Sequence, residues 1–336
     1  MSPKFLHIIS NCNHAVSLGN TLALIDDMSD HEILIEPSYY HSLDYFDRTK
    51  DVFKNTTRLD NSLNLSENTT VIIHGIFSQA IWDLTAKLIE SSVRTVWSIW
   101  GGDAKLLSNQ NNLKILNGLD FIICAPGETL PYPNLKVPEV HGCLYIPPVS
   151  FENRVRKQNL VVVGNSGDQS NDHPKLLKIL KDTRFEEIYL PLSYNCSSEY
   201  VEKLKKITKA LGLYEKTTFQ TDMLDLEDYC KIFQKAKVFL TAHNRQQSLG
   251  SMQIAYLNDC LVYMKKNIVF DNGASMLNPG YLTMLSMGYS DVYDVEELVT
   301  RTVDLTTPGN NKNTINSYNI RSEKYVRRVF NTLARA

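Results

Sequence analysis

The chain lacks several features that would assign it to a class at once. Its 336 residues include only six cysteines, and no two of them form a C-x-x-C pair. Such scattered cysteines indicate free thiols in a reducing compartment and argue against a disulfide framework or a zinc site. The net charge is only -2, so charge does not mark a nucleic-acid-binding protein. No apolar run approaches the ~20 residues of a membrane span, and we expect no secretory signal at the first residues.

The sequence also lacks the standard motifs of phosphate and metal chemistry. It contains no G-x-G-x-x-G, no G-x-x-x-x-G-K-[ST], no H-E-x-x-H and no G-x-S-x-G. It contains no Asp-x-Asp, and enzymes that hold a nucleotide diphosphate through a divalent cation commonly need such paired carboxylates. We therefore expect no bound metal, and we expect protein groups to neutralise a bound diphosphate.

Short apolar runs alternate with helical segments along most of the chain. Strands are predicted at 5–9, 32–36, 70–73, 94–100, 121–124, 160–163, 187–190, 217–219, 238–241 and 260–264. Helices are predicted at 16–28, 76–88, 174–181, 199–211, 226–236, 251–258 and 322–333, with a short one around 45–53. This alternation indicates parallel pairing, and therefore an α/β protein with doubly wound sheets.

The length favours two domains, at ~150 residues each. Residues 131–159 are rich in proline and end in basic residues, a composition typical of an interdomain linker. We therefore predict a first domain at 1–150, a second at 151–316, and a final helical segment at 317–336.

The stretch 160–173 suggests a phosphate cradle. Four apolar residues stop at Gly164, a polar loop follows, and a helix opens at Pro174. Backbone N–H groups and the helix dipole favour an anion at such a helix start. The alternative is an ordinary strand-to-helix turn, because turns use the same residue types. The loop residues predicted to bind are Gly164, Asn165, Ser166, Ser170, Asn171 and His173.

Two other polar loops of the second domain, 191–195 and 242–250, also follow strands. The carboxyl ends of parallel strands share one edge, so the three loops can converge on one ligand. Arg245 suits a diphosphate because its planar fork donates to two oxygens, although a surface arginine is the alternative. Further binding candidates in these loops are Ser193, Tyr194, Gln246, Gln247 and Gly250.

In the first domain, the candidate residues also lie where strands end. Asp103 is a candidate general base, or else the N-cap of a helix that starts near Ala104. His74 competes for the role of base. Trp100 has the shape to stack on a sugar ring, although a tryptophan in a strand is usually core. The remaining candidates, predicted to bind an acceptor, are His14, Gly75 and Gly101.

Four segments carry a resemblance to a known family: His74-Gly-Ile-Phe77 with Trp82, Ile99-Trp-Gly-Gly-Asp103, Val163-Gly-Asn-Ser-Gly-Asp168 with the residues up to His173, and Arg245-Gln-Gln247 with Gly250. They resemble H-G-x-F, I-W-G-A-D, V-G-N-S-G-D-x-S-N-x-H and R-Q-Q-G-x-G of the bacterial TDP-Fuc4NAc:lipid II transferases. That family moves 4-acetamido-4,6-dideoxygalactose from a dTDP-sugar to the lipid-linked precursor of enterobacterial common antigen. The similarity covers roughly residues 70–270.

The resemblance implies a GT-B fold, with two Rossmann-like domains and a cleft between them. The donor would lie mainly in the second domain and the acceptor in the first, and the final helix would return to the first domain. It also implies a cytoplasmic protein that lies peripherally on the inner membrane, where the lipid-linked glycan is found, and no cofactor beyond the nucleotide-sugar co-substrate. This sequence departs from the family at Ser98, Gly102, Ser193 and Ser248, which concerns the exact sugar and acceptor more than the reaction class.

The residues leave two other hypotheses open. The first is a non-enzymatic two-domain protein that closes on a sugar or nucleotide. The second is a sugar-nucleotide epimerase of related architecture, which would turn over a UDP-sugar without an acceptor.

Overall fold

The structure is a computed structural model of the chain. It describes residues 4–9, 12–25, 30–35, 56–58, 65, 68–128, 130, 132–145, 155–244, 247–269, 273, 275–299 and 311–335. The chain forms two compact units. Unit 1 comprises Met1–Pro148 together with Asn319–Ala336, and unit 2 comprises Val149–Tyr318. Each unit is described by itself.

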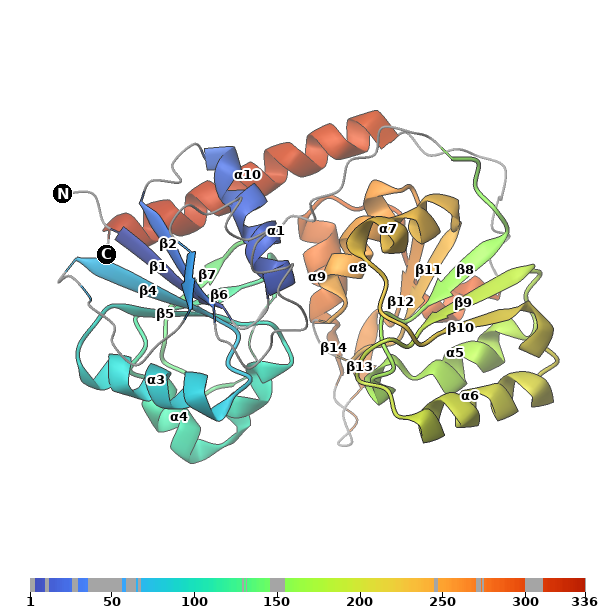
Figure 1. The fold of residues 1–336 in the computed structure, drawn as a ribbon, viewed down its shortest axis with the longest axis horizontal. Helices are drawn as coiled ribbons and strands as arrows, with labels where there is room; N and C mark the ends of the chain where they lie inside the picture. Colours follow the sequence, from blue (N-terminus) through green and yellow to red (C-terminus); the bar gives the residue numbers. More distant parts are fainter. Residues whose placement is uncertain are drawn as a thin grey trace. The chain divides into compact units, whose positions relative to one another are not determined.

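Unit 1 is built on a parallel sheet with the strand order β3-β2-β1-β4-β5-β6-β7 (Figure 1). Its strands are β1 (Lys4–Ile9), β2 (His31–Ile35), β3 (Thr56–Arg58), β4 (Thr69–His74), β5 (Thr95–Ser98), β6 (Phe121–Cys124) and β7 (Glu139–His141). Its helices are α1 (Cys12–Leu22), α3 (Gln79–Glu90), α4 (Gln110–Leu116), the 3-10 turns η1 (Ala23–Ile25) and η3 (Asp103–Ser108), and α10 (Asn311–Arg335) from Asn319 onward. The order reverses between β1 and β4, as in a doubly wound fold.

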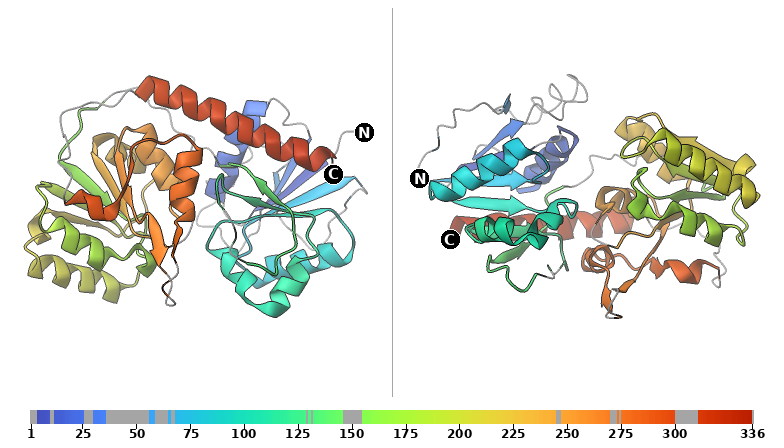
Figure 2. Two further views of the ribbon diagram at one scale, coloured as in Figure 1. Left: turned by 180° about the vertical axis from the view of Figure 1, so that it is seen from behind. Right: turned by 90° about the horizontal axis from the view of Figure 1, so that it is seen from below.

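Helices cover both faces of this sheet (Figures 1 and 2). On one face, α3 and α4 bury Ile81 and Leu113 against the strands. On the other, α1 and α10 bury Leu18 and Val329. Because successive strand residues point to opposite faces, strands covered on both sides read as continuous apolar runs, which is why β4 and β6 were visible in the sequence.

Unit 2 repeats this architecture with the strand order β10-β9-β8-β11-β12-β15, all parallel. Its strands are β8 (Leu160–Val163), β9 (Glu187–Pro191), β10 (Thr217–Gln220), β11 (Val238–Thr241), β12 (Leu261–Met264), β15 (Val292–Asp294) and a separate antiparallel pair, β13 (Asn267–Val269) and β14 (Ser275–Leu277). Its helices are α5 (His173–Leu180), α6 (Ser198–Ala210), α7 (Leu226–Lys235), α8 (Leu249–Leu257), α9 (Pro279–Ser286) and the 3-10 turns η4 (Gln169–Asn171), η5 (Tyr214–Lys216) and η6 (Val295–Leu298). The order again reverses between the first strand, β8, and the fourth, β11.

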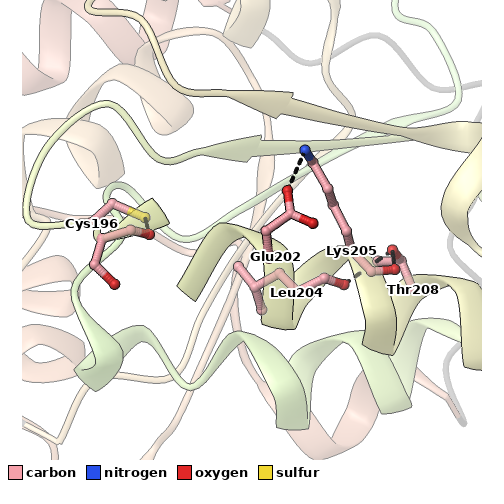
Figure 3. Close-up of polar contacts among 6 residues, drawn as sticks. Cys196, Glu202, Leu204, Lys205 and Thr208 are labelled. Atoms are coloured by element: carbon pink, nitrogen blue, oxygen red, sulfur yellow. Dashed lines mark hydrogen bonds and ion pairs between the residues drawn. The ribbon is translucent and has the colours of Figure 1, made fainter. Parts of the chain in front are cut away.

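Helix α6 shows how these helices divide between core and solvent. Leu204 is fully buried under the sheet, whereas the neighbouring lysines are mostly exposed. Figure 3 shows Lys205 paired with Glu202 at 2.8 Å, and Thr208 donating to the Leu204 carbonyl at 3.1 Å. The basic face of this helix is therefore solvated, and an exposed pair of this kind adds little to stability.

Three predictions about unit 1 were wrong. Residues 131–159 are not simply a linker, because β7 pairs with β6 and Leu144 is buried; proline does not interrupt β7 because Pro138 lies just before an edge strand. Helix α1 begins at Cys12 rather than Val16, so His14 lies in its first turn and not in a loop. The strand predicted at 94–100 ends at Ser98, which places Trp100 beyond it. The short helix predicted at 45–53 lies outside the described residues.

Among the described helices, none is both long enough and apolar enough to cross a membrane.

Candidate functional site

Asn165 joins the three loops that follow β8, β9 and β11. Its amide nitrogen donates to the Tyr194 hydroxyl at 2.6 Å. Its carbonyl oxygen accepts from the Ser248 hydroxyl at 2.7 Å and lies 3.2 Å from His243 Nε2. The predicted convergence of the three loops is therefore confirmed. The meeting point lies at the carboxyl ends of β8 and β11, where the strand order reverses and where α/β proteins bind ligands.

The loop after β8 is held from within by Asn171. Its amide nitrogen donates to the Ser166 and Asp168 carbonyls at 3.0 and 3.1 Å, and its carbonyl oxygen accepts from the Asn165 backbone at 3.3 Å. Asn165, Ser166 and Asn171 are all buried. The polar groups of these three residues, which were predicted to bind a ligand, thus form hydrogen bonds within the loop and fix its shape. Asp168 caps the turn by accepting from Ser170 N at 2.9 Å and so helps to shape the loop.

Gly164 is required where β8 ends. Its φ is +71°, and a Cβ there would lie 2.6 Å from His173 Nε2 and 2.8 Å from Asn171 Oδ1. His173 is buried, with Nδ1 3.2 Å from the Tyr200 hydroxyl, and Nε2 has no hydrogen-bond partner among the residues that the structure describes. Gly164 and His173 therefore pack the base of the loop, and burial lowers the pKa of His173 to about 4.

The groups left accessible at this edge are fewer than the sequence suggested. Ser170 is partly exposed and donates to Gln247 Oε1 at 3.1 Å, and Tyr194 is 42% exposed. Ser193 is partly exposed and contacts the Met223 sulfur at 3.7 Å. Gly250 lies in the first turn of α8, and apart from its chain neighbours and the helix's own backbone no atom of the described residues lies within 4 Å of the position of a Cβ. Arg245 and Gln246 lie outside the described residues.

His243 and Ser248 were not predicted as site residues. His243 is 2% exposed; its Nε2 lies 2.6 Å from the Ser248 hydroxyl and its Nδ1 lies 3.1 Å from the Ser170 hydroxyl. Asn278 donates to the His243 carbonyl at 2.6 Å. Only their position in a polar loop after a strand marked the first two in the sequence, and nothing local marked Asn278.

In unit 1, Asp103 fastens the loop between β5 and η3. One carboxylate oxygen accepts from Trp100 N at 2.9 Å, and the other from Ile76 N at 3.0 Å and Trp97 Nε1 at 2.9 Å. Asp103 is fully buried and is itself the first residue of η3, so its predicted role as N-cap is wrong. Burial raises its pKa to about 6, against the three hydrogen bonds, which favour the charged form.

His74, at the end of β4, is also fully buried, and both of its ring nitrogens have partners. Nε2 lies 2.8 Å from His7 Nδ1, and Nδ1 bonds the Tyr145 hydroxyl. Tyr145 additionally accepts from Trp100 Nε1 at 2.7 Å. Any effect of His74 on a ligand therefore passes through Tyr145, which is partly exposed. Tyr145 was not predicted because it lies in the segment taken for a linker.

His14 differs from His74 in being partly exposed. Its ring packs edge-on against Trp100, with the ring centroids 4.3 Å apart, and burial lowers its pKa to about 4. Among the described residues, no hydrogen bond to its ring nitrogens is seen. His14 is thus a neutral imidazole that can bond a hydroxyl group.

Phe77 lies over two glycines beside Trp100. Its side chain is 41% exposed, its ring centroid is 5.8 Å from that of Trp100, and a Cβ on Gly75 would lie 2.5 Å from the Phe77 ring. A Cβ on Gly102 would contact the same ring at 3.3 Å. Gly75 and Gly101 both have positive φ, +77° and +76°. Together with Trp100, Phe77 presents an aromatic surface at this edge.

The titration of buried histidines should make stability depend on pH. Burial lowers the pKa of four histidines: His7 well below the usual value, His14 and His173 to about 4, and His74 to about 3. Below pH 6.5 the unfolded chain binds these protons and the folded chain does not, so the free energy of unfolding falls as the pH is lowered towards 4, by up to about 1.4 kcal/mol per pH unit per histidine.

Two buried carboxyls oppose this trend. Burial raises the pKa of Asp103 to about 6 and that of Glu128 to about 7. As the pH falls, the folded chain therefore binds these two protons at a higher pH than the unfolded chain does. Because four histidines favour the unfolded chain at low pH and only two carboxyls favour the folded chain, the free energy of unfolding should fall on acidification. Urea unfolding at pH 7 and pH 5 measures it, and the His74→Gln variant should show a shallower dependence. Equal stability at both pH values would contradict the prediction.

Among the described residues, no group of three or more His, Cys, Asp or Glu side chains is arranged to hold a metal ion.

Comparison with protein families gives a match over residues 145–273 to the family described as 4-alpha-L-fucosyltransferase, glycosyl transferase group 56. The matched segment contains the three loops that meet at Asn165. The match confirms the resemblance inferred from the sequence motifs.

Solved structures of glycosyltransferases resemble the whole chain in fold. An O-GlcNAc transferase from Thermobaculum terrenum matches with a TM-score of 0.66 and 11% identity, over 99% of this chain and 67% of that one. Anabaena HepE in complex with UDP and glucose gives a TM-score of 0.62 and 12% identity, over 99% and 98%. The lipopolysaccharide outer core galactosyltransferase WaaB gives 0.55 and 10%, over 98% and 99%. The chain is thus a nucleotide-sugar-dependent glycosyltransferase with a GT-B fold, whose residues 145–273 match the group 56 family.

Proposed function

We propose that the protein transfers a deoxyaminosugar of the 4-acetamido-4,6-dideoxygalactose type from a dTDP-sugar to a hydroxyl of a polyprenyl-diphosphate-linked glycan. The observation that carries the proposal is the convergence of three loops on Asn165 at the switch point of unit 2, within the segment that matches group 56. The sequence motifs that resemble the TDP-Fuc4NAc transferases supply the finer identity of the donor. HepE, which shares the fold, is described with UDP and glucose.

On the donor side, the diphosphate would lie at the N-terminus of α8. The first backbone N–H groups of a helix have no partner within the helix and favour an anion. Gly250 leaves open space beside them, so a phosphate can approach the backbone closely. Ser170, Tyr194 and Gln247 line the same edge, and Arg245 would supply the positive charge that stabilises the leaving diphosphate. We infer that protein groups rather than a metal ion neutralise the diphosphate.

Replacing Gly250 by valine should weaken donor binding without destabilising the fold. Among the described residues, no side chain lies within 4 Å of the added Cβ, and glycine is a poor helix former, so the free energy of unfolding should stay within about 1 kcal/mol of the wild-type value. The branched side chain would occupy the proposed phosphate position and raise the Kd for dTDP by about tenfold or more, since a lost charge-assisted hydrogen bond costs about 1.5–3 kcal/mol.

Calorimetry with dTDP and urea unfolding test this prediction, and Gly212→Ala provides the control. Gly212 also has open space around its Cβ position but lies at the end of α6 with φ +70°. Its substitution should therefore cost stability and leave dTDP affinity unchanged. A Gly250→Val protein that binds dTDP like the wild type would place the diphosphate elsewhere.

On the acceptor side, the edge of unit 1 offers groups suited to a glycan. Phe77 and Trp100 present aromatic surface on which the apolar face of a sugar ring can pack, and His14 can accept a hydrogen bond from a sugar hydroxyl. These groups support the proposal that the acceptor binds to unit 1, as the resemblance implies.

Helix α10 fits a place at an anionic membrane surface. Its outward side exposes Arg321, Lys324, Arg327, Arg328 and Arg335. Basic side chains near the surface are attracted to anionic lipid by about 1 kcal/mol each. We place the protein peripherally on the cytoplasmic face of the inner membrane, where the lipid-linked acceptor would lie.

A thermal-shift screen of dTDP-, UDP- and GDP-sugars, followed by a transfer assay, tests the proposed function. A ligand that binds only the folded state raises its stability, and the dTDP-sugar should give the largest shift. Transfer should then require the polyprenyl-diphosphate glycan. Turnover of a UDP-sugar without an acceptor would indicate the epimerase, and binding without turnover a non-enzymatic binding protein.

A further inference from the structure

Three histidines form an unbroken buried row across unit 1. His7 Nδ1 lies 2.8 Å from His74 Nε2, and His7 Nε2 lies 2.8 Å from His31 Nδ1. The other nitrogen of His74 bonds Tyr145. None of the three histidines is more than 4% exposed. Glycosyl transfer by itself gives no reason for His7 and His31 to be histidines, because apolar side chains would fill the same core.

The strand order creates this row. Phe5 pairs with His31 on β2, and Ile9 pairs with His74 on β4, with His7 midway between them on β1. All these side chains point to one face, because every second residue of a strand does so. The row therefore runs diagonally over three neighbouring strands, from the amino end of β2 to the carboxyl end of β4.

The chemistry of the row restricts its protons. A neutral imidazole has one donor and one acceptor. Two successive N···N hydrogen bonds through neutral His7 must therefore point the same way, either from Tyr145 towards His31 or from His31 towards Tyr145. Shifting one proton in each bond converts one arrangement into the other. A row of this kind conducts a proton without any ring having to move along it.

We propose that the row from Tyr145 through His74 and His7 to His31 is a proton path for the acceptor hydroxyl. Tyr145 is its partly exposed end, at the edge that holds Trp100 and His14. Tyr145 would touch the acceptor and act as the catalytic group, whereas the three histidines act through it as positioning residues. The inference deepens the proposed function and rests on it.

In the proposed step, each bond that breaks is matched by a bond that forms. The acceptor O–H bond breaks, its oxygen forms the glycosidic bond, and its proton binds the Tyr145 oxygen. The Tyr145 proton passes to His74 Nδ1, the His74 Nε2 proton to His7 Nδ1, and the His7 Nε2 proton to His31 Nδ1. The anomeric C–O bond to the diphosphate breaks, and its electrons leave with the nucleoside diphosphate. His31 then carries the proton until it passes one to water.

The first test examines the row itself. ¹⁵N-histidine NMR of the wild-type protein should show two N–H···N hydrogen bonds, seen as scalar couplings between ring nitrogens of different histidines. This measurement needs neither substrate nor variant. Absence of both couplings in the folded protein would overturn the proton path.

The second test removes the middle histidine of the row. His7→Phe keeps a flat ring between His31 and His74 but removes both nitrogens. Using dTDP-4-acetamido-4,6-dideoxygalactose and a polyprenyl-diphosphate glycan, we expect kcat to fall by about 10²-fold, within the range of general acid–base catalysis. KM for both substrates should change by less than about twofold, as expected when only transition-state interactions are lost. Added imidazole should restore part of kcat by taking the proton at the exposed end.

A packing control separates this outcome from structural damage. Phe330 packs edge-on against His31 and His7, with ring centroids 4.9 and 6.2 Å apart, and carries no proton of the row. Phe330→Leu should therefore leave kcat near the wild-type value, and its rate should fall with increasing D₂O fraction along a curve, as for the wild type. The His7→Phe dependence should be less curved, because only the acceptor and Tyr145 protons can then move.

Failure of the proton path can be distinguished from failure of the proposed function. If the wild type transfers sugar and His7→Phe keeps its kcat, or loses it without imidazole rescue and with a D₂O dependence as curved as that of the wild type, only the proton path is overturned. If the folded wild type transfers no sugar from any of the nucleotide sugars tested, both the proposed function and the proton path fall.

Discussion

Asp103→Ala should lower the free energy of unfolding by about 3 kcal/mol or more and abolish sugar transfer at the same time. The carboxylate accepts three buried hydrogen bonds, from Ile76 N, Trp97 Nε1 and Trp100 N. Each donor left without an acceptor costs about 1–3 kcal/mol. Trp100 would lose its anchor, and with it the bond from its indole to Tyr145. Urea unfolding and the transfer assay measure the two effects.

The Asp103→Asn variant distinguishes this role from that of a general base. A base can be replaced by an isosteric amide with loss of activity and little loss of stability. In the arrangement seen here, the amide NH₂ would face a backbone or indole donor, so stability should fall as well. Binding of dTDP, which depends on unit 2, should persist in both variants and shows that unit 2 remains folded. If the Asp103→Asn protein is stable but inactive, Asp103 acts as a general base and not as an anchor of the loop.

Asn165→Ala should reduce the affinity for dTDP by about 10²-fold and destabilise unit 2 by about 2–3 kcal/mol. Asn165 connects the loops after β8, β9 and β11 through Tyr194, Ser248 and His243. Its removal deletes the hydrogen bonds to the Tyr194 hydroxyl and to the buried Ser248 hydroxyl and uncouples the loops, although Ser248 and His243 keep their mutual contact at 2.6 Å. Each lost hydrogen bond costs about 0.5–1.5 kcal/mol, and a binding site that must be ordered on binding loses affinity accordingly. Calorimetry with dTDP and urea unfolding measure the result.

Asn159→Ala is the matched control. Asn159 immediately precedes β8, whereas Asn165 follows it, and its amide donates to the Arg184 carbonyl at 2.8 Å. The same chemical change at the other end of the strand should leave dTDP affinity within about twofold of the wild type. If the two variants lose affinity equally, the effect arises from β8 as a whole and not from the junction of the loops.

The sequence was sufficient for the elements nearest the site. The β8 strand, the loop after it and the helix with Pro174 in its first turn were all predicted, because a strand buried on both faces reads as an apolar run and proline marks a helix start. The same reasoning failed at β7, a three-residue edge strand whose pairing with β6 is not visible in its own residues.

The sequence did not reveal which polar side chains of the site are buried within the loop and which remain accessible. Asn165, Ser166, Asn171 and His173 have the chemistry of ligand contacts, yet they are buried and shape the loop. Whether a polar group faces a ligand or a neighbouring backbone depends on residues far along the chain. Asp103 is the same case, since two of its three donors, Ile76 and Trp97, belong to other segments.

The alternation of strands and helices, the glycine at the end of β8 and the polar loops at the strand ends could all be predicted from the amino-acid sequence, because each rests on local backbone sterics or hydrophobic periodicity. The row formed by His31, His7, His74 and Tyr145 becomes apparent only in the folded protein. The four residues come from separate segments of the chain, and only the order β2-β1-β4 brings the three histidines within hydrogen-bonding distance of one another. That order is fixed by long-range packing, which no local pattern encodes.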